Sequence, residues 1–113
     1  MPKSIVAALQ IGALPGGKAD TLAQILSYEA AIRDAGASVV VMPEALLGGY
    51  PKGETFGTQL GYRLPEGRDA FARYFENAID VPGAETDALA EMSARTGASL
   101  VIGVIERAGS SLF

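Results

Sequence analysis

Residues 39–53 read VVVMPEALLGGYPKG, and the first four of them decide the fold. Val39 to Met42 is a short apolar run in which apolar and polar positions do not alternate. Two other runs are similar, Ile5 to Ile11 (IVAALQI) and Leu100 to Ile105 (LVIGVI). Nearly continuous apolar runs of this length are typical of strands in parallel sheets. The sequence therefore predicts three strands of a parallel sheet.

Helical patterns occupy the segments between these runs. The segment from Asp20 to Ala35 has apolar residues at helical spacing, with Asp20 as a candidate N-cap and Gly36 where a left-handed residue would end the helix. A weaker helical pattern covers Arg68 to Ile79, and a third helical pattern covers Glu85 to Thr96, with Gly97 at its end. The order β-α-β-loop-α-α-β predicts an α/β fold in which right-handed crossovers join parallel strands.

Composition narrows the class of protein. The net charge of the 113 residues is -4 and the Lys and Arg residues are scattered, which argues against nucleic acid or an anionic membrane as a partner. No apolar run is as long as a transmembrane helix, and the N-terminus lacks the apolar core of a signal peptide, so we expect a cytoplasmic protein. No linker or internal repeat divides the chain into domains.

The sequence contains no Cys and no His. Their absence removes disulfides, thiolate or imidazole metal ligands, thiol nucleophiles and Ser-His pairs from these 113 residues. Any acid–base chemistry in the chain must therefore use carboxylates, Lys or Tyr.

The first candidate site is a phosphate-binding loop. Gly12 to Lys18 matches the pattern G-x-x-x-x-G-K between a predicted strand and a predicted helix. However, Ala19 stands where Ser or Thr would bind Mg²⁺, and Pro15 lacks a backbone N–H that the phosphate cradle would need. We favour an ordinary strand-to-helix turn, and keep the phosphate loop as the alternative.

The second candidate is Glu44, which follows the second predicted strand and opens a Gly-rich irregular stretch, Ala45 to Gly67. Sites in open α/β sheets form beyond the carboxyl ends of the strands, and long irregular stretches are often functional. The strand would fix the backbone of Glu44 while the loop leaves room for a ligand. A catalytic or binding role is one interpretation, and helix capping or an ion pair is the other.

Residues 39–53 resemble the first catalytic motif of the nitrilase, or carbon–nitrogen hydrolase, superfamily, in which a strand, Pro-Glu, an apolar link and a Gly-Tyr-Pro loop follow one another. Ala78 to Gly83 (AIDVPG) and Gly97 to Glu106 (GASLVIGVIE) follow in the family's order, so the resemblance covers essentially the whole chain. GGYPKG is most similar to true nitrilases, rather than to amidases or carbamoylases. The resemblance implies that residues 1–113 are the N-terminal part of a single, incomplete domain of the four-layer α-β-β-α type.

The resemblance also implies a reaction. Family members hydrolyse nonpeptide C–N bonds with a Glu-Lys-Cys triad and without a metal or organic cofactor. Glu44 would then be the general base, a nitrile would be the substrate, and the full-length protein would form a homo-oligomer. Tyr50 would line the substrate pocket, although packing on the edge of the sheet would explain this residue as well.

The chain departs from the family's pattern in the other two members of the triad. It contains no Cys, and neither Lys3, Lys18 nor Lys52 stands at the catalytic lysine position. We therefore expect these residues to be inactive alone. The alternative is a non-catalytic α/β module that only associates with other subunits. In either case, helices on one side of three strands would leave an apolar sheet face bare, so we expect the isolated chain to associate, bind apolar dyes or fold poorly.

Overall fold

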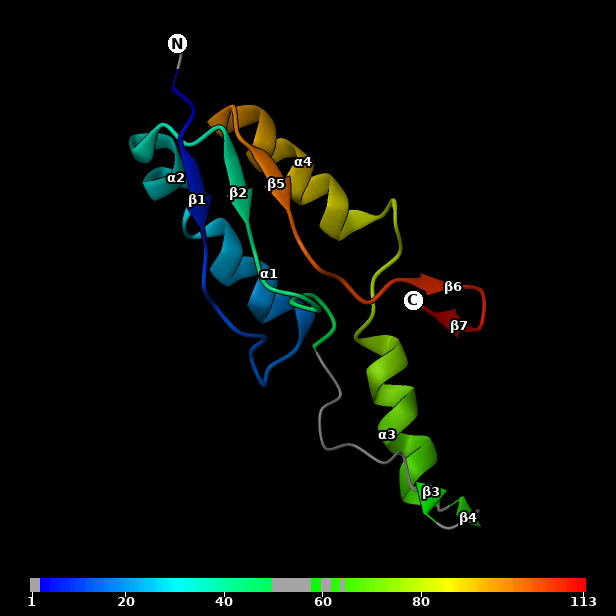
Figure 1. The fold of residues 1–113 in the computed structure, drawn as a ribbon. Coiled ribbons are helices and arrows are strands. Elements are labelled where there is room, and N and C mark those ends of the chain that lie inside the picture. The colour runs from blue at the N-terminus through cyan, green and yellow to red at the C-terminus, as the bar shows by residue number, and fades with distance from the viewer. Residues whose placement is uncertain (1–2, 50–57, 60–61, 64) are drawn as a thin grey trace.

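The structure, a computed structural model, describes residues 3–49, 58–59, 62–63 and 65–113. Its centre is a parallel three-stranded sheet in the order β1 (Val6–Ala8), β2 (Val39–Val41) and β5 (Ser99–Val101) (Figure 1). Val6 pairs with Val39, and Val39 pairs with Ser99. The predicted parallel sheet is confirmed.

The strands are shorter than the apolar runs that predicted them, because the chain leaves the ladder soon after each one. Each ladder continues for one more bond, from Leu9 N to Val41 O at 2.9 Å and from Met42 N to Val101 O at 2.8 Å. The residues after β5 then hydrogen-bond to a turn and a loop instead of to another regular strand. The apolar runs therefore extend beyond the regular strand structure.

The long helix predicted over 20–35 is two helices, α1 (Lys18–Leu26) and α2 (Glu29–Ala35). At Ser27 the amide is shared between the carbonyls of Ala23 and Gln24, and the Ser27 hydroxyl also donates to Gln24 O, at 2.5 Å. A serine that competes for backbone carbonyls and tightens the last turn favours a helix end. The apolar spacing continued across this break and so did not reveal it.

The prediction that Asp20 caps the first helix is wrong, since the N-cap is Gly17 and Asp20 lies in the first turn. Thr21 explains the earlier start. Its hydroxyl accepts from Leu14 N at 2.9 Å and donates to Gly17 O at 3.1 Å, which organises the residues before the helix. The predicted left-handed residue Gly36 is confirmed, with φ 68°.

The remaining helices are α3 (Pro65–Glu76) and α4 (Ala84–Thr96). α3 begins three residues before the predicted start, with proline in the first turn, where its missing N–H costs nothing. Two short strands lie within the stretch predicted to be irregular over 45–67, namely β3 (Thr58–Gln59) and β4 (Tyr62–Arg63), which pair antiparallel. The chain ends in a second antiparallel pair, β6 (Arg107–Ala108) and β7 (Ser111–Leu112).

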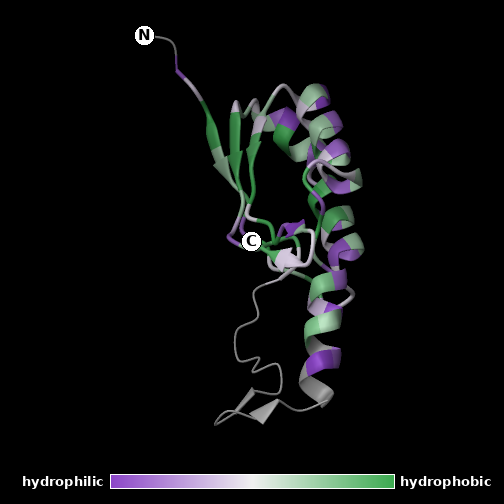
Figure 2. Cartoon of the chain, turned by 90° about the vertical axis from the view of Figure 1, so that its right-hand side faces the viewer, coloured by the Kyte–Doolittle hydropathy of each residue, from purple (hydrophilic) through white to green (hydrophobic). Residues whose placement is uncertain are grey.

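In the described part of the chain, helices cover only one face of the sheet, as Figure 2 shows. Ile25, Val40 and Met92 are fully buried between α1, β2 and α4. Glu29 of α2 accepts a charged hydrogen bond from Arg95 of α4, with N···O distances of 2.8–2.9 Å, and this contact lowers the pKa of the Glu29 carboxyl. The helical layer is therefore packed both on the sheet and within itself.

The other face of the sheet is apolar and exposed. Val6, Val41 and Val101 are 64%, 42% and 54% exposed, and they alternate along the strands with inward-facing residues such as Val40. The expectation of a bare apolar sheet face is confirmed. Among the described residues, no helix is long and apolar enough to cross a membrane.

Candidate active site at the carboxyl ends of the strands

Glu44 lies in a turn directly after β2, beyond the carboxyl end of that strand. Its side chain is exposed, and no hydrogen bond or ion pair joins its carboxylate to another described residue. The next three residues, Ala45 to Leu47, are buried. Within the described part of the chain, neither helix capping nor an ion pair explains Glu44.

The turn has an unusual backbone. Ala45 adopts φ 51°, a left-handed conformation that residues with a Cβ rarely adopt. Gly48 and Gly49 also have positive φ, at 107° and 78°, and Gly49 N donates to Ala45 O at 3.0 Å. A strained alanine next to a candidate catalytic residue persists only where its surroundings hold it.

The segment 103–107, which follows β5, holds this turn from one side. Gly103 N donates to Pro43 O at 3.2 Å, and Leu47 N donates to Gly103 O at 3.3 Å. A Cβ on Gly103 would lie 2.6 Å from the Glu44 Cα and 2.5 Å from Ala45 N. Only glycine allows the two backbones to approach this closely.

The same segment is bonded on its other side to the residues after α3. Ile79 N donates to Ile105 O at 2.9 Å, and Arg107 N donates to Ile79 O at 2.7 Å. Ile105 N donates in turn to Leu47 O, at 2.8 Å. The segment therefore lies between the Glu44 turn and the connection from α3 to α4, and joins them.

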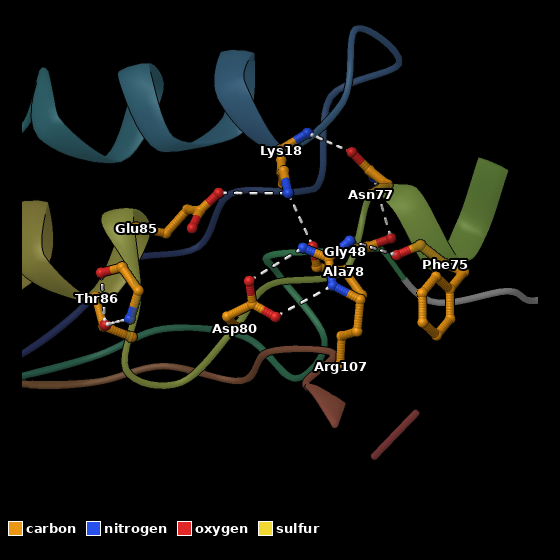
Figure 3. Close-up of polar contacts among 10 residues, drawn as sticks. Lys18, Gly48, Phe75, Asn77, Ala78, Asp80, Glu85, Thr86 and Arg107 are labelled. Atoms are coloured by element: carbon orange, nitrogen blue, oxygen red, sulfur yellow. Dashed lines mark hydrogen bonds and ion pairs between the residues drawn. The ribbon is translucent and has the colours of Figure 1, made fainter. Parts of the chain in front are cut away.

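A polar cluster connects α1, α3 and α4 beside this segment (Figure 3). Lys18 N donates to Asn77 Oδ1 at 2.7 Å, while Lys18 Nζ donates to Ala78 O at 2.9 Å and lies 3.4 Å from a Glu85 carboxylate oxygen. Since these protein groups occupy both the amide and the ammonium group of Lys18, the geometry supports an ordinary turn over 12–18 rather than a phosphate loop.

Arg107 and Asp80 form a second ionic contact in the same region. The guanidinium donates to both Asp80 carboxylate oxygens, at 3.1 and 3.3 Å, which lowers the pKa of the Asp80 carboxyl. Arg107 also donates to Phe75 O at 3.3 Å, and its guanidinium carbon lies 5.6 Å from the centre of the Phe75 ring. These contacts attach the end of α3 to β6 and leave Arg107 engaged with protein groups.

A cleft of about 430 Å³ lies between the start of α1 and the last turns of α3. It is lined by Pro15, Gly16, Gly17, Arg73, Tyr74, Glu76 and Asn77. Glu44 is not among these described lining residues, but Asn77 is, and its side chain also bonds to Gly48 of the Glu44 turn. Tyr50, predicted to line the substrate pocket, and Lys52 lie outside the described residues.

Sequence comparison identifies the family. A family model described as carbon-nitrogen hydrolase matches residues 5–113. The chain belongs to the carbon-nitrogen hydrolase family. The motif over 39–53 that predicted this family contains Glu44, at the end of β2 in the structure.

Several members of this family are similar to the chain. A nitrilase from Bradyrhizobium diazoefficiens is 54% identical over 79 residues, covering 70% of this chain and 25% of the relative. An aliphatic nitrilase from Sinorhizobium fredii is 45% identical over 115 residues, covering 100% of this chain and 37% of the relative. A bifunctional nitrilase/nitrile hydratase from Nicotiana tabacum is 46% identical, covering 83% of this chain and 28% of the relative. The chain thus spans about a quarter to just over a third of these relatives' length.

Sequence reasoning missed two residues that shape the site. Gly103 lies inside an apolar run, and its neighbours in the sequence do not indicate its contact with the Glu44 backbone. Asn77 fell at the end of a helical pattern, and its partners are 29 and 59 residues away. The only available signal was the glycine itself, because a glycine inside a strand pattern often marks a close backbone approach.

Proposed function

We propose that this chain supplies the general base, Glu44, of a nitrilase-type hydrolase that converts a nitrile to a carboxylic acid and ammonia. One observation carries the proposal: the family's Pro-Glu motif places a carboxylate without a described partner beyond the end of β2. The nitrilase names of the similar proteins support a nitrile as the substrate class. We further propose that residues 1–113 form the N-terminal part of one α-β-β-α domain.

The proposed reaction needs a thiol nucleophile that this chain does not contain. Glu44 takes the thiol proton, the thiolate adds to the nitrile carbon, and the nitrogen is protonated to give a thioimidate. Addition of water, activated by Glu44, expels ammonia and leaves a thioester. A second water then releases the carboxylic acid and restores the thiol, while a lysine stabilises the tetrahedral intermediates.

The chemistry sets a condition on the surroundings of the base. The pKa of a free glutamate is about 4.3 and that of a free thiol is about 8.5, so a solvated carboxylate is a poor base for a thiol. A pocket that excludes water narrows this difference. The carboxylate of Glu44 is exposed in this structure, so the proposal requires polypeptide outside these 113 residues to enclose it and to bring the Cys and Lys.

A chimera tests the proposal. The matching residues of the Sinorhizobium fredii aliphatic nitrilase would be replaced by this chain, and ammonia release from an aliphatic nitrile would be measured. We expect an active chimera and an inactive isolated chain. Glu44→Gln should lower the single-turnover rate of the chimera by about 10²–10⁴-fold, the usual contribution of a general base.

The matched control is Glu91→Gln, which makes the same change on α4, where the side chain is 72% exposed. It should leave the rate unchanged. A Glu44→Gln chimera as fast as its parent would remove Glu44 from the mechanism.

The bare apolar face of the sheet favours a second candidate function, an α/β module that only pairs with other subunits. The same chimera separates the two candidates. A chimera that folds and assembles but releases no ammonia would support the pairing module and contradict the proposed hydrolase.

A further inference from the structure

Asn77 makes two different hydrogen bonds with the two ends of its side-chain amide (Figure 3). Its Oδ1 accepts from Lys18 N at 2.7 Å, and its Nδ2 donates to Gly48 O at 3.3 Å. One partner can only donate and the other can only accept, so the partners themselves fix which way the amide faces. Asn77 therefore bridges the start of α1 and the far end of the Glu44 turn.

The first contact caps a helix. Gly17, the N-cap residue of α1, has no side chain that could accept from the free amides of the first turn. Asn77 provides that acceptor from 59 residues away. A Cβ on Gly17 would lie 3.0 Å from Asn77 Oδ1, so the glycine also leaves room for the cap.

The second contact fixes one peptide group. The peptide between Gly48 and Gly49 donates through Gly49 N to Ala45 O and accepts through Gly48 O from Asn77. Both residues are glycines with positive φ, so the peptide plane between them has little steric resistance to rotation. Its orientation depends on these two hydrogen bonds, and Asn77 makes the one that does not come from the turn itself.

Asn77 is itself held in place by its neighbours. Ala78 and Ile79 are fully buried, Ala78 O accepts from Lys18 Nζ, and Ile79 pairs with the segment 103–107. An amide that follows directly from α3 and precedes two anchored residues has little freedom to move. This anchoring allows Asn77 to restrain the turn instead of following it.

We propose that Asn77 is a positioning residue, which fixes the Gly48–Gly49 peptide and through it the turn that carries Glu44. The catalytic consequence rests on the proposed function, whereas the effect on the turn does not. Asn77 acts through Gly48 and has no assigned contact with the reacting atoms. A base displaced by a loosened turn loses rate because a misplacement of about 1 Å costs on the order of a hundredfold.

Asn77→Asp separates capping from positioning. The aspartate has the same shape, and one oxygen can still accept from Lys18 N at the positive end of α1. Its other oxygen cannot donate to Gly48 O and repels that carbonyl. Asn77→Ala, in contrast, removes both contacts.

Amide hydrogen exchange on the chimera tests the effect on the turn, because the isolated 113 residues are expected to associate or fold poorly. In Asn77→Asp, the Gly49 amide should exchange about tenfold faster, the order of effect expected for the loss of one hydrogen bond, while the Thr21 amide of α1 keeps its protection. In Asn77→Ala both amides should exchange faster. The proposal would be overturned if the Gly49 amide exchanged at the same rate in the parent and in Asn77→Asp. This includes the case in which the amide is unprotected in both proteins.

The chimera tests the catalytic consequence. Asn77→Asp should lower kcat by about tenfold or more with little change in KM, measured well below the melting temperature of both chimeras. A purely structural cap would leave kcat at the parent value, and that result would overturn the positioning role. If the parent chimera were inactive, the proposed function would fail, and the exchange experiment would still decide whether Asn77 holds the turn.

Discussion

Replacing Gly103 by alanine tests whether close backbone contact sets the position of Glu44. The added Cβ would lie 2.5 Å from Ala45 N, 2.6 Å from Glu44 Cα and 2.8 Å from Glu44 C. All three are backbone atoms, so no flexible side chain can rotate away. The segment 103–107 or the Glu44 turn must move.

The size of the effect follows from two opposing contributions. Overpacking by one methyl group costs about 1–3 kcal/mol, and contact with backbone places this site in the upper part of that range. Gly→Ala also reduces the entropy of the unfolded chain, which stabilises by about 0.4–1 kcal/mol where the backbone tolerates alanine. We expect Gly103→Ala to lower the free energy of unfolding by about 1–2 kcal/mol.

Gly12→Ala is the matched control, because a Cβ there would meet nothing within 4 Å. Urea unfolding followed by far-UV circular dichroism, at one protein concentration, would give both values. Gly12→Ala should be neutral or slightly stabilising. A midpoint for Gly103→Ala at or above that of the parent would refute the claim that the two backbones are in contact.

Two further predictions concern surface charge and the bare face. Because the Arg107 guanidinium lowers the pKa of Asp80 below its ordinary 3.8 in the folded chain, this pair stabilises the fold above that value and the contribution is lost as the pH falls through the lowered pKa. The difference in unfolding free energy between the parent and Asp80→Asn should therefore be present at neutral pH and shrink as the pH falls below 3.8; a pH-independent difference would contradict the linkage. On the bare face, Val41→Glu with Val101→Lys, an adjacent pair in register, should reduce self-association and binding of an apolar dye, measured by sedimentation and fluorescence. A parent chain that is already a dye-free, cooperatively melting monomer would contradict this.

The sheet and helices were largely predictable because their signals are local. Apolar runs indicated all three strands of the parallel sheet, and glycines at the left-handed positions 36 and 97 marked two helix ends. The break at Ser27 was not predictable, since it depends on a side chain that competes for carbonyls within a pattern that otherwise stays helical. The start of α1 was misplaced for a related reason: its cap comes from Asn77, far along the chain.

The candidate site, too, was predictable from the sequence only in part. Glu44 was found because a strand end, a proline and a Gly-rich loop are adjacent in sequence. What holds Glu44 there could not be read from local patterns, because Gly103 and Asn77 act through contacts that exist only once β5 and α3 have packed. Local sequence thus predicted the candidate residue and missed the contacts that hold its backbone.

The backbone contacts around Glu44 explain how the strained conformation of Ala45 is tolerated. Ala45 sits in an unfavourable left-handed conformation, and Glu44 beside it has no described partner to hold it. The segment 103–107 bonds to the residues on both sides of that strained position, and Asn77 bonds to the peptide at the turn's far end. Hydrogen bonds to an ionised carboxylate favour its charged form and so weaken it as a base. The structure fixes the backbone around Glu44 and not its side chain, which is the arrangement that the proposed role of Glu44 as a base would use.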